Sequence, residues 1–181
     1  DAYAAGSYGH ANGFDKILVG RSSGGAFHLR VHFWPGQDFE EQNVHDHRFE
    51  FWSYVLRGTI VSHVWRPCAD GREFRRYTYE PRGSADSYVL KGHEMALLNI
   101  AGSETWPEGS VYAFGHHKLH TIKCLDKPVT VLLEDRRNLL DVAQVYSSHL
   151  RDDEVRVSSP ALEVTKYTAA IRRALDFAST R

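Results

Sequence analysis

Val44-His45-Asp46-His47-Arg48-Phe49-Glu50-Phe51-Trp52 is the stretch that decides the fold, together with Leu119-His120-Thr121 far downstream. Histidines two apart on a β-strand point the same way, because successive side chains alternate between the two faces. His45 and His47 can therefore bind one divalent metal ion with their imidazoles. A third ligand then has to come from another part of the fold.

Composition and charge favour one domain with a small-molecule partner. The chain has 181 residues, 42% hydrophobic and 12% aromatic, which is ample for a core. Its formal net charge of −1 provides no basic field for nucleic acid. Cys68 and Cys124 are too few for a disulfide framework, and no apolar run approaches the roughly 18 residues of a membrane-spanning helix. We therefore expect a cytoplasmic protein that binds neither nucleic acid nor a membrane, although a start at Asp1 leaves a trimmed leader open.

Short strands separated by turn signals predict an all-β fold. Turn signals such as Asp70-Gly71 and Pro107-Glu108-Gly109 separate segments that are rich in β-branched and aromatic residues or alternate in polarity. Many short, mostly antiparallel strands at this spacing indicate a sandwich or a barrel. The predicted strands cover residues 15–19, 26–34, 52–57, 59–65, 74–79, 95–100, 110–114, 119–124 and 129–134.

The end of the chain changes to a helical period. Ser159 is a capping residue, and Pro160 suits the first turn of a helix. An apolar stripe follows at helical spacing and comprises Val164, Tyr167, Ile171, Ala174 and Ala178. This predicts a helix over about residues 160–178 that packs on a barrel of about residues 14–146, within a single domain spanning residues 1–181.

The first histidine motif resembles that of the cupin superfamily. That motif is Gly, five residues, His-x-His, three or four residues, Glu, six residues, Gly. His45-Asp46-His47 and Gly58 match it, and Gly36 is a loose counterpart of the leading glycine.

The second cupin motif is matched in part. It is Gly, five residues, Pro-x-Gly, two residues, His, three residues, Asn. Gly109 and His120 fall on this spacing, whereas Gly115, His117 and Cys124 occupy the Pro, second Gly and Asn positions. Together the two motifs cover residues 36–124, which is about half of the chain.

The resemblance implies a cupin-like double-stranded β-helix, a jelly-roll barrel, with one metal ion bound by His45, His47 and His120. Three neutral imidazoles suit Fe(II), Zn, Ni, Mn or Cu, and they leave positions open for water, dioxygen or substrate.

The glutamate of the cupin motif would stand at Phe51 or Trp52, but Glu50 comes one place early. On a regular strand Glu50 faces away from the ion, and only a β-bulge would turn it back.

A site of three histidines resembles the thiol dioxygenases among the cupins, which also lack this Glu and begin with His-Asp-His. We favour this version over one in which Glu50 takes part in the site. His117 could replace His120 as a ligand or act as a general base, or it could simply be a loop residue.

Other residues are candidates for substrate binding. Arg30 and His32 belong to a polar stripe that begins at His28 and alternates with apolar residues. If the stripe faces the barrel interior, Arg30 could clamp a substrate carboxylate with help from His32. If it faces solvent, which we favour, it has no such role. Trp52 is one of the aromatic residues expected to shape the pocket, and Tyr112 is a candidate phenol for ordering substrate or an oxygen species.

The expected function is that of a mononuclear non-heme Fe(II) oxygenase, an oxidoreductase of the dioxygenase kind acting on a small polar or carboxylate-bearing molecule. A lyase, isomerase or hydrolase could use the same ion as a Lewis acid. A non-catalytic cupin that only binds a ligand is a third alternative, because one fold hosts many functions. The exposed strand edges of such barrels would also allow a homodimer.

Overall fold

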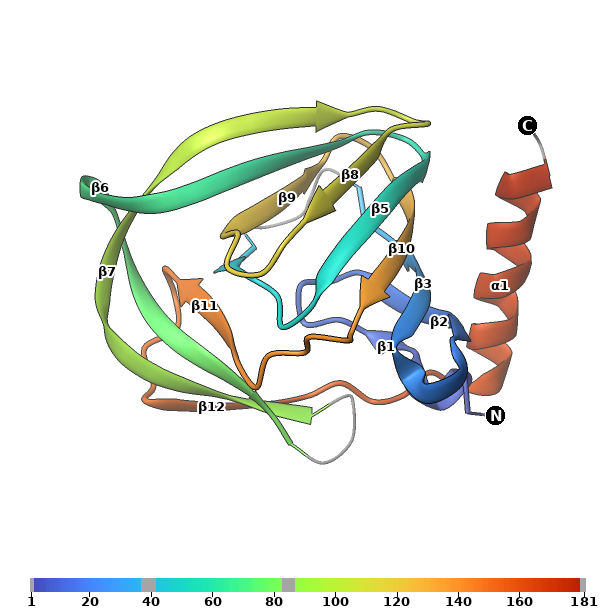
Figure 1. Ribbon diagram of the computed structural model, residues 1–181, viewed down its shortest axis with the longest axis horizontal. Helices are drawn as coiled ribbons and strands as arrows, with labels where there is room; N and C mark the ends of the chain where they lie inside the picture. The colour runs from blue at the N-terminus through green and yellow to red at the C-terminus, as the bar shows by residue number, and fades with distance from the viewer. Residues whose placement is uncertain (1, 37–41, 83–86, 180–181) are drawn as a thin grey trace.

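Two antiparallel β-sheets form the body of the protein in the computed structural model, which describes residues 2–36, 42–82 and 87–179 (Figure 1). Sheet A has the strand order β1-β2-β3-β10-β5-β8, and sheet B has the order β11-β4-β9-β6-β7-β12. Sheet A contains β1 (Tyr8–Gly9), β2 (Asp15–Arg21), β3 (Phe27–Phe33), β5 (Glu50–Arg57), β8 (Val111–Phe114) and β10 (Val129–Asp135). Sheet B contains β4 (Val44–His45), β6 (Ile60–Pro81), β7 (Ser87–Trp106), β9 (His120–Cys124), β11 (Ala143–Ser147) and β12 (Glu154–Ser158).

The chain crosses between the sheets in the jelly-roll manner. From β3 to β10, strands β3, β5, β8 and β10 lie in sheet A, and β4, β6, β7 and β9 lie in sheet B. This double Greek key confirms the predicted all-β jelly-roll barrel. Inward side chains of both sheets, with Phe14 and Trp34 from the flanking segments, form a core between the sheets. Its strand residues are Phe51, Val55, Ile60, Tyr112, Phe114, Ile122, Cys124 and Leu132.

Strands β6 and β7 are longer than predicted and curve together around one side of the barrel (Figure 1). A turn at Asp70-Gly71 was expected to separate two strands, and this expectation is wrong. Pro67 and Arg72 both pair with Leu98, so the four residues between them form a bulge within β6. Gly71 allows the bulge to approach β7, because a Cβ there would lie 2.6 Å from the Leu98 carbonyl oxygen.

The bulged β6 closes sheet B on itself. Its first half pairs with β9 over Ile60 to Val64, and its second half pairs with β11 over Arg75 to Tyr79. Strand β4 pairs with both β9 and β11. The sequence prediction assigned no strand to β11 or β12, and sheet B extends beyond the predicted barrel boundary near residue 146.

The C-terminal helix α1 spans Val164–Ser179, so its predicted start near residue 160 is wrong. Residues before it are held in an extended conformation by the N-terminal segment. Ala161 forms a β-bridge with Tyr8, and the Leu162 N–H donates to the Ser7 carbonyl at 2.8 Å. Those backbone bonds replace the helical ones that Ser159 and Pro160 would have begun.

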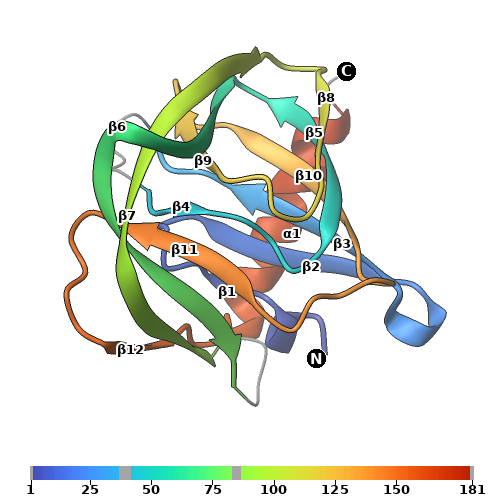
Figure 2. The same ribbon diagram turned by 60° about the vertical axis from the view of Figure 1, so that its left-hand side comes forward.

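Helix α1 lies on the side of sheet A that faces away from sheet B (Figure 2). Residues on one side of it pack against Ile17, Val31, Phe33, Leu56 and Val129. These helical residues are Tyr167, Ala170, Ile171, Ala174 and Phe177. The two ends of the predicted stripe do not pack, since Val164 is 54% exposed and Ala178 is also exposed.

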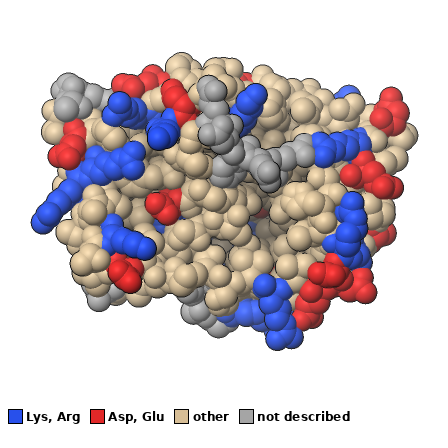
Figure 3. Space-filling model, turned by 180° about the vertical axis from the view of Figure 1, so that it is seen from behind, with Lys and Arg blue, Asp and Glu red and all other residues tan. Residues whose placement is uncertain are grey.

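Charged side chains of both signs are interspersed over the face shown in Figure 3, in keeping with the net charge of −1. No helix in the described part of the chain is long and apolar enough to cross a membrane.

Candidate metal centre

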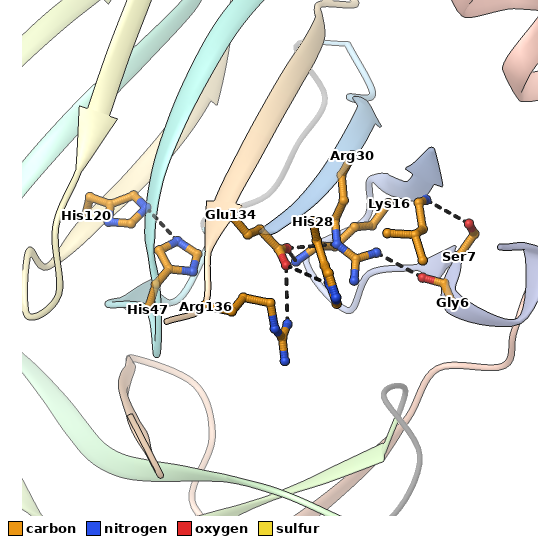
Figure 4. Close-up of polar contacts among 10 residues, drawn as sticks. Gly6, Ser7, Lys16, His28, Arg30, His47, His120, Glu134 and Arg136 are labelled. Atoms are coloured by element: carbon orange, nitrogen blue, oxygen red, sulfur yellow. Dashed lines mark hydrogen bonds and ion pairs between the residues drawn. The ribbon is translucent and has the colours of Figure 1, made fainter. Parts of the chain in front are cut away.

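Two histidines on neighbouring strands of sheet B, and a third from the segment that follows β4, converge at one point inside the barrel. Their nearest ligand nitrogens all lie within 4.8 Å of one another. The Nε2 atoms of His47 and His120 are 3.3 Å apart (Figure 4). Two nitrogens that bind one ion at about 2.0–2.1 Å stand about 2.8–3.0 Å apart in octahedral geometry and about 3.3–3.4 Å apart in tetrahedral geometry. The His47–His120 pair therefore has the spacing of two metal ligands.

Strand pairing and a turn bring the three side chains together. His45 on β4 lies directly opposite His120 on β9, so both side chains point to the same face. Strand β4 ends at His45, so the prediction that both histidines of the motif lie on one strand is wrong. His47 reaches the cluster from the segment beyond the strand, and its ring centroid lies 5.0 Å from those of both His45 and His120.

Backbone carbonyls orient two of the imidazoles. Nδ1 of His45 lies 2.9 Å from the Asn43 carbonyl oxygen, and Nδ1 of His120 lies 2.8 Å from that of Lys118. Because a carbonyl only accepts hydrogen bonds, each Nδ1 carries the proton, and each Nε2 keeps a lone pair for a ligand bond.

Burial keeps the cluster neutral. It lowers the pKa of His45, and it brings the pKa values of His47 and His120 well below the usual range, with neighbouring imidazoles acting in the same direction. A neutral imidazole is the form that binds a metal. The residues present therefore fit a divalent ion with nitrogen ligands.

Glu50 lies outside the cluster. Its side chain is 50% exposed, and Oε1 is 3.7 Å from Nδ1 of His116. The inward position belongs to Phe51, whose ring centroid is 4.9 Å from that of His47. No bulge interrupts the pairing of β5 with β10 at this point, since Glu50 and Phe51 pair in register with Asp135 and Glu134. Strand parity therefore holds, and in the described part of the chain the group consists of the three histidines.

Three other candidates stand away from the histidines. His117 has a positive φ of 63° and a side chain that is 76% exposed, with Nδ1 3.7 Å from Asp46 Oδ2. Trp52 is 43% exposed, because it alternates with the buried Phe51.

Tyr112 is buried but is separated from the histidines by other rings. It contacts Phe51 and Phe114, and these two rings contact the histidines. Burial raises its pKa to about 12, so the phenol keeps its proton.

The polar stripe of β3 faces the barrel interior, and the favoured solvent-facing interpretation is wrong. Arg30 is 4% exposed and His32 is 5% exposed. The alternating residues Val31 and Phe33 lie on the other face, where α1 covers them. Arg30 already binds groups of the protein itself. Its Nε donates to the Glu134 carboxylate at 2.8 Å, and its Nη1 donates to the Gly6 backbone carbonyl at 2.9 Å.

Glu134 on β10 is the centre of an ionic network that the sequence prediction missed (Figure 4). It is fully buried, and its carboxylate oxygens lie 3.1 Å from Lys16 Nζ, 2.8 Å from Arg30 Nε and 3.3 Å from Arg136 Nη1. Burial alone would raise the pKa of Glu134, but the charges of Lys16 and Arg30 and a hydrogen bond from His28 hold it well below its usual value. The available signal was the row of polar residues at alternate positions of β3, namely His28, Arg30 and His32.

Asp46, between His45 and His47, connects this part of the chain to β11 by hydrogen bonds. Its Oδ1 accepts the Gln144 N–H at 2.6 Å, and its own N–H donates to the Gln144 carbonyl at 3.1 Å. The side chain is buried, with 5% of the residue exposed. It therefore fixes the path of the chain between His45 and His47.

Replacing Asp46 with alanine should weaken metal binding about tenfold, the lower end of what supporting residues of metal sites contribute. Asp46→Asn should bind nearly as well as the wild type, because its amide oxygen can still accept the Gln144 N–H. Competition with a chelator of known affinity measures both variants. Equal metal affinity in Asp46→Ala and the wild type would contradict this role.

Comparison with known proteins assigns this chain to no family. No protein-family model matches the chain, and no curated protein matches it. Among solved structures, ectoine synthase from P. lautus aligns over 88% of this chain and 86% of its own, with a TM-score of 0.43 and 10% sequence identity. The fold therefore rests on the strand order of this chain itself.

Proposed function

We propose that this protein is a metal-dependent enzyme of the cupin type, with a mononuclear centre formed by His45, His47 and His120. The observation that carries the proposal is the convergence of three neutral imidazoles, two of them oriented by backbone carbonyls. Oriented nitrogen ligands are typical of a built site, because the second partner of each ring sets its tautomer. A core histidine without a metal role would direct its nitrogens to protein partners instead.

The three-ligand set favours catalysis over simple storage of an ion. Four to six ligands are usual for such metals, so three histidines leave positions for substrate. We infer Fe(II) and a dioxygenase reaction, because three neutral imidazoles suit Fe(II) and the open positions would admit both dioxygen and substrate. A ferrous ion there would supply electrons to dioxygen. The chain's own contribution is a set of aromatic rings that limits water: Phe49 and Phe51 against His47, and Phe114 against His120.

Elemental analysis of protein purified without added metal tests this proposal first. We expect about one iron per chain, and oxygen consumption in the presence of a carboxylate-bearing substrate that stops under anaerobic conditions. Zinc in place of iron, with turnover that persists without oxygen, would instead favour a lyase, isomerase or hydrolase that uses the ion as a Lewis acid. A chain that holds no metal, even after incubation with Fe(II), Zn(II), Mn(II), Ni(II) or Cu(II), would overturn the proposal.

A further inference from the structure

Among the described residues, the ionic group around Glu134 beside the metal centre carries more positive than negative charge. Lys16 and Arg30 are 9% and 4% exposed, and Arg136 contacts the same carboxylate from a less buried position. All three share Glu134, so one negative charge faces three permanent positive charges. Buried charge is costly unless it is compensated. The interior is therefore suited to an anion that comes from outside the chain.

Glu134 and the Gly6 carbonyl engage two of the five N–H donors of Arg30 and fix the direction of its guanidinium. The ammonium of Lys16 is the cation that lies nearest to the aromatic ring beside His47. An ammonium group has three N–H donors, and the contact with Glu134 at 3.1 Å accounts for one of them. The same ammonium lies 5.4 Å from the centroid of the Phe49 ring.

His32 is the neighbour of Lys16 on the interior face of sheet A. The two residues are directly opposite each other on β3 and β2, so their side chains share the interior face. Within the described part of the chain, neither ring nitrogen of His32 has a hydrogen-bond partner, although the residue is only 5% exposed. Buried polar groups are nearly always paired, so an unpaired imidazole points to a missing ligand. The rings of Phe14 and Trp34, with centroids 5.0 Å and 5.9 Å away, hold it in place.

This pair lies next to the metal centre. Phe49, which the Lys16 ammonium contacts, has its ring centroid 5.3 Å from that of His47. Burial, and then the charge of Lys16, bring the pKa of His32 well below its usual range. The ring is therefore neutral and can donate one hydrogen bond beside the positive ammonium.

We propose that Lys16 and His32 form a subsite that binds a carboxylate group of the substrate beside the three-histidine centre. The oxygens of the carboxylate accept N–H bonds from the Lys16 ammonium and the His32 imidazole. Glu134 and Arg30 are positioning residues that keep the ammonium directed into the interior. The assignment of a substrate rests on the proposed function, but binding of an anion at this subsite does not depend on the metal.

Acetate, with acetamide as its neutral counterpart, is the probe for this subsite. Both are titrated into the protein as purified and after loading with Zn(II), and the ring nitrogens of His32 are followed by NMR. We expect saturable shifts with acetate and a Kd at least about tenfold lower than for acetamide, as a charge-assisted hydrogen bond implies. Lys16→Met should raise the Kd for acetate about tenfold or more, and Lys16→Arg should largely restore it.

Lys91→Met is the matched control, because Lys91 also pairs with a glutamate, at 2.9 Å from Glu80, but its side chain is 45% exposed. It should leave the acetate affinity unchanged. Should Lys16→Met fail to fold, His32→Phe keeps the ring shape, and calorimetry should show a similar loss of affinity. Equal affinities for acetate and acetamide, or an unchanged Kd in Lys16→Met or His32→Phe, overturn the subsite. Acetate binding at His32 in a chain that takes up no metal would uphold the subsite and refute the proposed function instead.

Discussion

Loss of nearly all bound metal is the expected result of replacing His47 with alanine. His47 supplies one of the two nitrogens that already stand at ligand spacing, 3.3 Å apart. Without it two histidines remain, too few for a stable mononuclear site. We expect the metal content to fall from about one ion per chain to below about a tenth after dialysis, measured by elemental analysis. His47 lies outside the regular strands, so the fold should be retained.

His63→Ala provides the matched control. His63 lies on β6 opposite Thr121, the residue next to His120, but its Nδ1 is 2.6 Å from Ser103 Oγ on β7. This variant should bind as much metal as the wild type. Unchanged metal content in His47→Ala, or an equal loss in His63→Ala, would show that the three histidines are not the ligand set.

The second large effect is on stability, and it comes from Glu134. Glu134→Gln removes the carboxylate that Lys16 and Arg30 share and leaves both cations buried without compensation. Breaking a buried pair by removing one partner costs about 3–5 kcal/mol of unfolding free energy. Urea unfolding followed by tryptophan fluorescence measures the loss. Glu154→Gln, which breaks the exposed pair with Arg156, should cost less than about 1 kcal/mol.

The pH dependence of this effect has a definite sign. The pKa of Glu134 in the folded protein lies well below its ordinary value of 4.5, so folding favours the ionised form. Its contribution is therefore complete above about pH 4.5 and is lost as the pH falls towards the folded pKa. We expect the difference in unfolding free energy between wild type and Glu134→Gln to shrink below that pH. A constant difference down to pH 3 would show that the charge of Glu134 is not what stabilises the network.

The alternation of polar and apolar residues along the sequence predicted the strands well where one face is apolar and the ends carry turn residues. It failed at Asp70-Gly71, because the same dipeptide that ends a strand can also form a bulge when a partner strand continues past it. It also placed the start of α1 too early, because the bonds of Ala161 and Leu162 to the N-terminal segment are not visible in local sequence.

The sequence by itself determined the all-β class and the candidate histidines, because strand period and motif spacing are local properties of the chain, whereas the jelly roll was implied by the resemblance to the cupins. The outward position of Glu50 followed from strand parity in the same way. Only the tertiary structure decided which face of β3 is the interior one. The alternation of residues gives that strand a polar and an apolar face, but it does not determine which of them faces the barrel interior. Helix α1 covers the apolar face at Val31 and Phe33, so the polar face is the interior one. Arg30 and His32 are thereby buried beside Lys16 and Glu134, a combination that no local pattern contains.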